Sequence, residues 1–242
     1  ADLPHVTGLL RPVDAKKIPD FLRHVCAFDL RAATAVDEKR PELYQQQSQR
    51  NKLRSTATTF REFIDSLQLH VSVEPPAARD YERAAQLTQR TNQFNTSGIR
   101  RTAAELSALF ESGQRGALLL RARDRFGDYG DIGLAVFSVE QQNLVVDTLL
   151  FSCRVLGKGV EHRFLAALGA EAKSLGTSDV VFPFKRTERN QPAENFLKSI
   201  GAQLRDDSAF HLATSAAAAV AFDPEKRLED LPLGLFMHAM PG

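Results

Sequence analysis

Tryptophan is absent from these 242 residues, and cysteine and methionine occur only twice each. No apolar run, the stretch 216–222 included, approaches the ~20 residues that cross a bilayer, which excludes a membrane segment. Cys26 and Cys153 lie far apart, and the six histidines show no H-x-x-x-H spacing, so neither a disulfide framework nor a metal site is predicted. Reduced thiols and the lack of a secretion signal favour a cytoplasmic protein.

An excess of charge of either sign is also missing. Lysine and arginine total 31 against 30 acidic residues, so the basic footprint of a nucleic-acid-binding protein is absent. The 43% hydrophobic and 25% charged residues are those of an ordinary globular protein whose core needs no metal or disulfide. We therefore expect neither nucleic acid nor membrane as the main partner.

The first part of the chain is predicted to be helical and peripheral. Apolar residues recur at helical spacing over 18–25, and a polar helix with few apolar anchors is predicted over 42–54. Thr59 with Glu62 forms a capping box that begins a third helix. We interpret residues 1–68 as a helical extension with a docking or bridging role.

A mixed domain is predicted over 69–242, because apolar and polar residues alternate from Leu69 until Pro75 and Pro76 end a strand. Strands are predicted near 69–74, 116–124, 131–139, 144–152, 179–183, 209–214 and 217–222. Helices are predicted near 78–93, 102–112, 158–175 and 191–200. This order, with hairpins joining the second to fourth strands, predicts an α+β fold with mixed strand directions rather than a doubly wound sheet.

A glycine-rich turn joins the fourth predicted strand to a helix, with the pattern Arg154-x-x-Gly157-x-Gly159. Glycines leave backbone N–H groups uncovered at the helix start, where the helix dipole favours a phosphate. The spacing is neither that of a Rossmann fingerprint nor that of a P-loop. The turn is therefore a candidate anion site, the alternative being a strand-to-helix turn that binds nothing.

This turn resembles the acyl-CoA pyrophosphate loop of the GNAT acyltransferase superfamily, and the predicted strand order is similar to the GNAT fold. A narrower resemblance is to the C-terminal part of FkbH-like proteins. Three stretches carry it: Thr91-Asn-Gln-Phe-Asn95, Asp124-Arg-Phe-Gly-Asp128 followed by Gly130, and Ser152-Cys-Arg-Val-Leu-Gly-Lys-Gly-Val-Glu161. The family implies loading of a glyceryl unit, derived from 1,3-bisphosphoglycerate, onto an acyl carrier protein in polyketide pathways.

FkbH-like proteins couple a HAD-type domain to a GNAT-like domain, and the HAD chemistry needs a D-x-D-x-T-type loop that this sequence does not contain. We therefore expect the chain to be a C-terminal fragment, with 1–68 as the extension that joined it to a HAD-type domain of the same parent protein. The phosphate-removing step is not assigned to this chain.

The resemblance implies a ligand that is either acyl-CoA or the phosphopantetheine of a carrier protein. The residues that it places on this ligand are Arg154, Leu156, Gly157, Lys158, Gly159, Val160 and Asn190. A general-acid tyrosine of many GNAT enzymes is replaced by Leu197, which has no proton to donate. This replacement weakens an ordinary acetyl-transfer mechanism, in which a general acid contributes about 10² to 10⁴ in rate.

Two residues are candidate catalytic groups. Asp147 lies mid-strand on the face predicted to be shared by Val145, Leu149 and Phe151, where a carboxylate is buried at a cost unless it has a partner. We interpret Asp147 as a general base or acceptor-binding group, the alternative being a structural ion pair. Cys153 precedes the glycine turn and is a candidate nucleophile, although a buried structural thiol is the more ordinary role.

Polar residues near the end of the first helix of the mixed domain are candidate substrate contacts, because the resemblance places the acceptor site there. The alternative for the asparagines is a helix C-cap. The full set of candidate substrate residues is Asn92, Gln93, Asn95, Asp128, Thr148 and Ser152. His162, in the first turn of the helix after the glycines, is expected to be exposed.

Three functions stay open at this point. The favoured one is docking of a carrier's phosphopantetheine, or of acyl-CoA, for acyl (glyceryl) transfer. The second is a conventional acetyl-CoA-dependent N- or O-acetyltransferase. The third is a catalytically inactive GNAT fold that serves as an interaction module.

Overall fold

The computed structural model describes residues 40–225, so the helix predicted over 18–25 and Cys26 lie outside the described residues. The chain divides into two compact units after Thr56. The smaller unit contains helix α3, Arg40–Thr56, where a polar helix is predicted over 42–54. The origin of 1–68 as an extension from a HAD-type domain stays a prediction.

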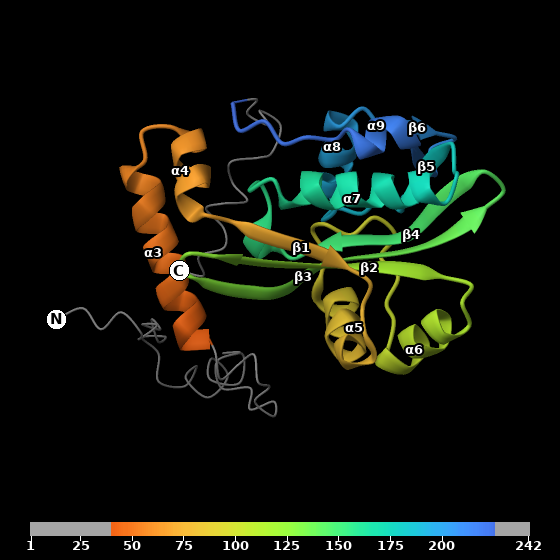
Figure 1. Ribbon diagram of the computed structural model, residues 1–242, viewed down its shortest axis with the longest axis horizontal. Coiled ribbons are helices and arrows are strands. Elements are labelled where there is room, and N and C mark those ends of the chain that lie inside the picture. Colours follow the sequence, from red (N-terminus) through yellow and green to blue (C-terminus); the bar gives the residue numbers. More distant parts are fainter. Residues whose placement is uncertain (1–39, 226–242) are drawn as a thin grey trace, which may run out of the picture. The chain divides into compact units, whose positions relative to one another are not determined.

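One seven-stranded sheet forms the centre of the larger unit (Figure 1), with the order β1-β2-β3-β4-β5-β7-β6. Its strands are β1 His70–Glu74, β2 Gly116–Asp124, β3 Gly127–Glu140, β4 Asn143–Phe151, β5 Asp179–Pro183, β6 Gln203–Arg205 and β7 Ala209–Ala213. Only β4 and β5 run parallel, and all other neighbours are antiparallel. Parallel pairing requires a crossover, which α7 provides.

Helices cover both faces of this sheet. They are α4 Phe60–Leu67, α5 Tyr81–Arg90, α6 Ala103–Glu111, α7 Val160–Ser174, α8 Gln191–Ser199 and α9 Thr214–Ala218, with short 3-10 turns η3 Ala78–Asp80 and η4 Cys153–Val155. Figure 1 shows α5 and α6 on one face, and α7, α8 and α9 on the other. The predicted α+β class, a mixed sheet of GNAT-like order flanked by helices, is confirmed. Within residues 40–225, no helix has the length and apolarity needed to cross a membrane.

The strand predicted over 217–222 is wrong. Alanine-rich α9 covers its first two residues, and residues 219–222 form no strand. The strand that pairs with β7 on the side away from β5 is β6, which the sequence pattern did not reveal. Alanine is the strongest helix former, and the small residues of α9 pack against Gly169 of α7. A Cβ at Gly169 would lie 2.2 Å from the backbone nitrogen of Ala218, so only glycine permits this approach.

The capping residues predicted for α4 have their expected roles in part. Thr59 Oγ1 accepts a hydrogen bond from the Glu62 N–H at 3.1 Å, while the Glu62 carboxylate accepts from Thr58 rather than from Thr59. Leu67 at the end of α4 is fully buried, and its carbonyl accepts from the Arg125 N–H. Helix α4 therefore packs against the hairpin between β2 and β3, as part of the larger unit.

Candidate functional site

The parallel strands β4 and β5 are hydrogen-bonded over only three residue pairs, from Asn143↔Asp179 to Val145↔Val181. Beyond this point residues 94–96, called here the inserted segment, lie against β4. The Thr96 N–H donates to the Leu149 carbonyl and the Phe151 N–H donates to the Phe94 carbonyl, both at 3.1 Å. On its other side the Thr96 carbonyl accepts from Lys185, which follows β5. The opening between the two strands is thus filled by the chain itself.

The inserted segment belongs to the hydrophobic core. Phe94 is 2% exposed, and its ring packs edge-on against Phe151 at 4.7 Å and tilted against Phe196 at 5.4 Å. Replacing a buried phenylalanine with alanine generally costs about 3–5 kcal/mol, so displacing the whole segment is at least as costly. The backbone hydrogen-bonding groups at this end of β4 are therefore already engaged.

Two predicted site residues hold the inserted segment in place. Asn190, 2% exposed, donates from Nδ2 to the carbonyls of Asn95 and Lys185, at 3.0 and 2.9 Å. Asn95, 3% exposed, donates to the Thr91 carbonyl and accepts from the Gly98 N–H. Asn190 uses both N–H donors inside the protein, and Asn95 uses its Oδ1 and one N–H, so both amides shape this region.

The glycine turn also holds an anion supplied by the chain. The Glu161 carboxylate, in the first turn of α7, accepts a hydrogen bond from the Gly157 N–H at 2.5 Å. Burial raises the pKa of Glu161 to about 7. Hydrogen bonds from the backbone N–H groups of Glu161 itself, Gly157 and Gly159 lower this pKa, but they offset only part of the effect of burial. The Glu161 carboxylate thus occupies the position at the helix start where the sequence predicts a phosphate.

Phe222 covers the same turn from outside. A Cβ at Gly159 would lie 2.4 Å from the Phe222 ring, and Gly159 has a φ of +81°, which favours glycine for a second reason. His162 packs against Phe222 and Phe196, and it is buried rather than exposed as expected. This burial lowers the pKa of His162 to about 4. The turn is therefore a packed part of the core on this side.

Two cationic side chains that the resemblance places on the ligand instead contact the hairpin between β2 and β3. Arg154 donates to the Tyr129 carbonyl at 3.2 Å, and Lys158 Nζ lies 3.2 Å from the Tyr129 hydroxyl and 4.8 Å from its ring centroid. The Tyr129 hydroxyl in turn donates to Asp124 at 2.7 Å. The second and third motif stretches of the sequence therefore meet at the end of β4.

The predicted surroundings of Asp147 are wrong. A bulge in the β3–β4 register, between the pairs Val136↔Thr148 and Phe137↔Val146, turns Asp147 away from the face of Leu149. The Asp147 carboxylate instead binds Arg101 at 2.9 Å, Arg115, and the Thr148 hydroxyl at 2.8 Å. With 13% of its side chain exposed, Asp147 is partnered in the way that a buried carboxylate requires. Its catalytic role stays a prediction.

The other predicted residues do not gather in one site. Cys153 is exposed in η4, so its interpretation as a buried thiol is wrong. Leu156 and Val160 are buried in the hydrophobic core that also contains Leu197. Asp128 accepts from the Gly130 N–H within the β2–β3 turn. Gln93 is exposed, Ser152 is half-buried and Thr148 is fully buried.

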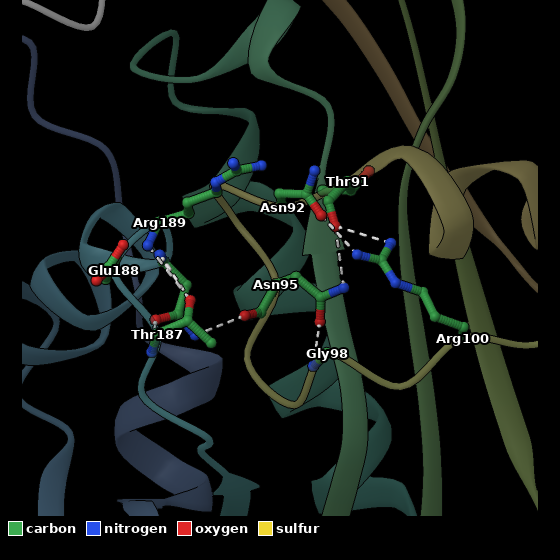
Figure 2. Close-up of a pocket in the computed structure, with 9 residues that line it drawn as sticks. Thr91, Asn92, Asn95, Gly98, Arg100, Thr187, Glu188 and Arg189 are labelled. Carbon is green, nitrogen blue, oxygen red and sulfur yellow. Dashed lines mark hydrogen bonds between the residues drawn. The ribbon is translucent and has the colours of Figure 1, made fainter.

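A polar cavity of about 270 Å³ lies next to the inserted segment (Figure 2). It is formed by the chain between α5 and α6 and the chain between β5 and α8. Its lining residues are Thr91, Asn92, Asn95, Gly98, Arg100, Thr187, Glu188, Arg189 and Asn190. Sequence reasoning identified the asparagines but missed Arg100 and Arg189, because nothing local indicates that the two loops meet.

The way in which GNAT proteins are expected to hold acyl-CoA does not fit the residues present. The turn that the GNAT resemblance assigns to the pyrophosphate hydrogen-bonds Glu161. The GNAT resemblance also implies that the pantetheine enters where the fourth strand separates from the fifth, and here the inserted segment lies between β4 and β5. Leu197, fully buried, supplies no proton donor. The polar cavity is the accessible part of this region that carries uncommitted polar groups.

Comparison with known proteins finds similarity in the fold. No protein-family profile and no curated protein sequence matches the chain. Spermidine N-acetyltransferase from Vibrio cholerae, solved with CoA and spermine, is 10% identical, with a TM-score of 0.49 over 61% of this chain and 97% of its own. An N-acetyltransferase from Staphylococcus aureus Mu50 is 14% identical, with a TM-score of 0.46 over 60% and 99%. The ribosomal-protein-S18-alanine N-acetyltransferase from Escherichia coli is 10% identical, with a TM-score of 0.45 over 65% and 98%.

Proposed function

We propose that this chain is the GNAT-like domain of an FkbH-like protein, and that it docks an acyl carrier protein for acyl (glyceryl) transfer in polyketide biosynthesis. The acyl end of the carrier's phosphopantetheine is received at the polar cavity, from outside the sheet. The HAD-type domain of the parent protein supplies the phosphate chemistry. Acyl-CoA, which carries the same thioester, is the alternative ligand.

One observation carries this proposal: the three motif stretches, far apart in the sequence, meet around the end of β4. The first stretch pairs with the end of β4 through Phe94, whose carbonyl accepts from the Phe151 N–H, and through the bridge between Asn95 and Leu150. The second contacts the third through Tyr129, which binds Arg154 and Lys158. Motifs shared with a family for separate reasons have no need to converge on one place, whereas motifs of a common site do.

A conventional acetyl-CoA-dependent acetyltransferase is less well supported by the same geometry. Its cofactor would have to displace both the inserted segment and the Glu161 carboxylate, and Leu197 offers no general acid. The inserted segment between β4 and β5 does favour a second candidate. This candidate is a non-catalytic interaction module that binds the folded part of the carrier protein and makes no contact with its phosphopantetheine.

Calorimetry with the carrier protein in its holo and apo forms, and with CoA, tests the proposal. We expect glyceryl-loaded holo carrier to bind at least about tenfold more tightly than apo carrier, a difference of about 1.4 kcal/mol that the arm contributes. Equal affinity for the two forms would overturn the proposal in favour of the interaction module. Turnover of acetyl-CoA by this chain, with no carrier binding, would overturn it in favour of a conventional acetyltransferase.

A further inference from the structure

Arginine side chains with unused donors face the polar cavity. Arg100 donates to the carbonyls of Thr88 and Thr91 at the end of α5, and to Asn92 Oδ1 at 2.5 Å. A guanidinium has five N–H donors, and these three contacts leave two of them available. Across residues 40–225, the Arg189 side chain makes no hydrogen bond or ion pair.

The remaining lining residues are committed differently. Asn190 Oδ1 accepts from the Thr187 N–H, and its Nδ2 donates twice within the protein. Asn92 accepts from Arg100 through Oδ1, which leaves its Nδ2 as a donor. The threonine hydroxyls of the lining can donate or accept, whereas the amide and charged groups that remain available toward Arg189 are donors: Asn92 Nδ2 and the two guanidinium groups.

The charge of the cavity is positive. Its single acidic lining residue, Glu188, forms no ion pair with the described residues. Figure 2 shows Arg189 extending toward Asn92, with the Glu188 carboxylate pointing away from both. Charge-assisted hydrogen bonds from guanidinium groups to a carboxylate or phosphate are about twice as strong as neutral ones. Charged donors, with the one carboxylate of the lining turned away from them, favour an oxyanion as the ligand.

The size of the cavity limits the ligand. Sites for drug-sized molecules measure about 300–1,000 Å³, and this cavity of about 270 Å³ lies below that range. It has room for a group of a few non-hydrogen atoms rather than for a nucleotide or a whole pantetheine arm.

We propose that the polar cavity binds a small oxyanion, a carboxylate or phosphate on a short carbon skeleton, held by Arg189, Arg100 and Asn92. This inference rests on the proposed function for the source of that group. A glyceryl thioester has no free carboxylate, so the anion that docking would present is the phosphate of a phosphoglyceryl unit, which the HAD-type domain has not yet removed. Arg100 is fixed against the end of α5, so it positions the anion, while Arg189 closes on it from the facing loop.

Nitrogen-15 NMR titration with glycerate, glycerol 3-phosphate and glycerol tests the inference, because the three probes share a skeleton and differ in charge. We expect one or both anions to shift the Asn92 side-chain amide signals, and glycerol to leave them unmoved. Arg189→Gln should weaken anion binding at least about tenfold, as expected for losing a charge-assisted pair. Arg123→Gln, which alters an exposed arginine outside the cavity, should leave it unchanged.

Three results would overturn the inference: no shift with either anion, glycerol binding as strongly as the anions, or an unchanged affinity in Arg189→Gln. The same samples separate the inference from the proposed function. If the chain binds holo carrier but neither anion binds at the cavity, the inference alone is overturned. Anion binding at the cavity of a chain that fails to bind any carrier would support the inference and overturn the docking function.

Discussion

The Glu161 carboxylate lies 2.5 Å from the Gly157 backbone nitrogen, so a side chain of α7 closes the turn from which α7 begins. A helix start favours a nearby negative charge, and above about pH 7, where Glu161 is ionised, that charge is internal. The adjacent His162 is buried as well, against two phenylalanine rings. An acid with a raised pKa and a base with a lowered pKa thus stand side by side.

These two residues should give opposite pH dependences of stability. The pKa of Glu161 rises on folding from 4.5 to about 7, so the native state holds a proton that the unfolded chain releases, and stability falls as the pH rises through this window. The pKa of His162 falls from 6.5 to about 4, so stability rises with pH between about 4 and 6.5. At 1.36 kcal/mol per unit, each effect amounts to roughly 3 kcal/mol, and they oppose each other where the windows overlap.

Single variants should separate the two effects. We expect the free energy of unfolding of Glu161→Gln to rise from pH 4.5 to 6.5, because His162 alone then titrates. His162→Phe should show the reverse, a decrease from pH 4.5 to 7. Urea unfolding at a series of pH values measures both slopes, and parallel pH profiles for wild type and Glu161→Gln would show that folding does not raise the pKa of Glu161.

Removing the internal anion should create an external anion site. Glu161→Ala leaves the amides of the glycine turn without an acceptor, which costs about 1–3 kcal/mol for a buried donor. Phosphate should restore part of this loss by binding the folded state, so the melting temperature of the variant should rise with phosphate concentration more than that of wild type. The exposed Glu111→Ala is the matched control, and an equal response in all three proteins would contradict the account.

Local patterns in the sequence were sufficient for the elements but not for the site. Alternation and helical spacing located β1, β2 and β5 within a residue, because these signals depend on neighbours along the chain. The bulge that redirects Asp147 depends on register with β3, and the inserted segment depends on hydrogen bonds to β4, so neither leaves a local signature. Glu161 carried a signal that was missed: an acidic residue in the first turn of a helix competes with any external anion.

Asp147 should matter for stability. Asp147→Asn removes the charge that compensates Arg101 and Arg115, and breaking a buried pair leaves an uncompensated charge. Because Arg115 keeps 29% of its side chain exposed, we expect a loss of about 2 kcal/mol, or about 4 to 8 °C in melting temperature. The exposed Asp65→Asn should change stability by less than about 0.5 kcal/mol. An unchanged melting temperature in Asp147→Asn, with carrier binding lost, would restore the interpretation of Asp147 as a functional residue.

Phe94 should behave as a core residue. Phe94→Ala leaves a cavity between Phe151 and Phe196, with an expected cost of about 3–5 kcal/mol. Phe126→Ala, in the half-buried turn between β2 and β3, should cost less than half as much. Chemical denaturation of both variants checks this, and a cost below about 1 kcal/mol for Phe94→Ala would show that the inserted segment leaves the sheet readily.

The most direct test of the account is amide hydrogen exchange at Thr96 and Phe151, whose N–H groups join the inserted segment to β4. If this segment is a permanent part of the sheet, both amides exchange as slowly as the core amides of β4, and they stay protected when CoA or glyceryl-loaded holo carrier is added. Loss of protection at these two amides on adding either ligand would contradict the account, because it would show that pantetheine enters between β4 and β5.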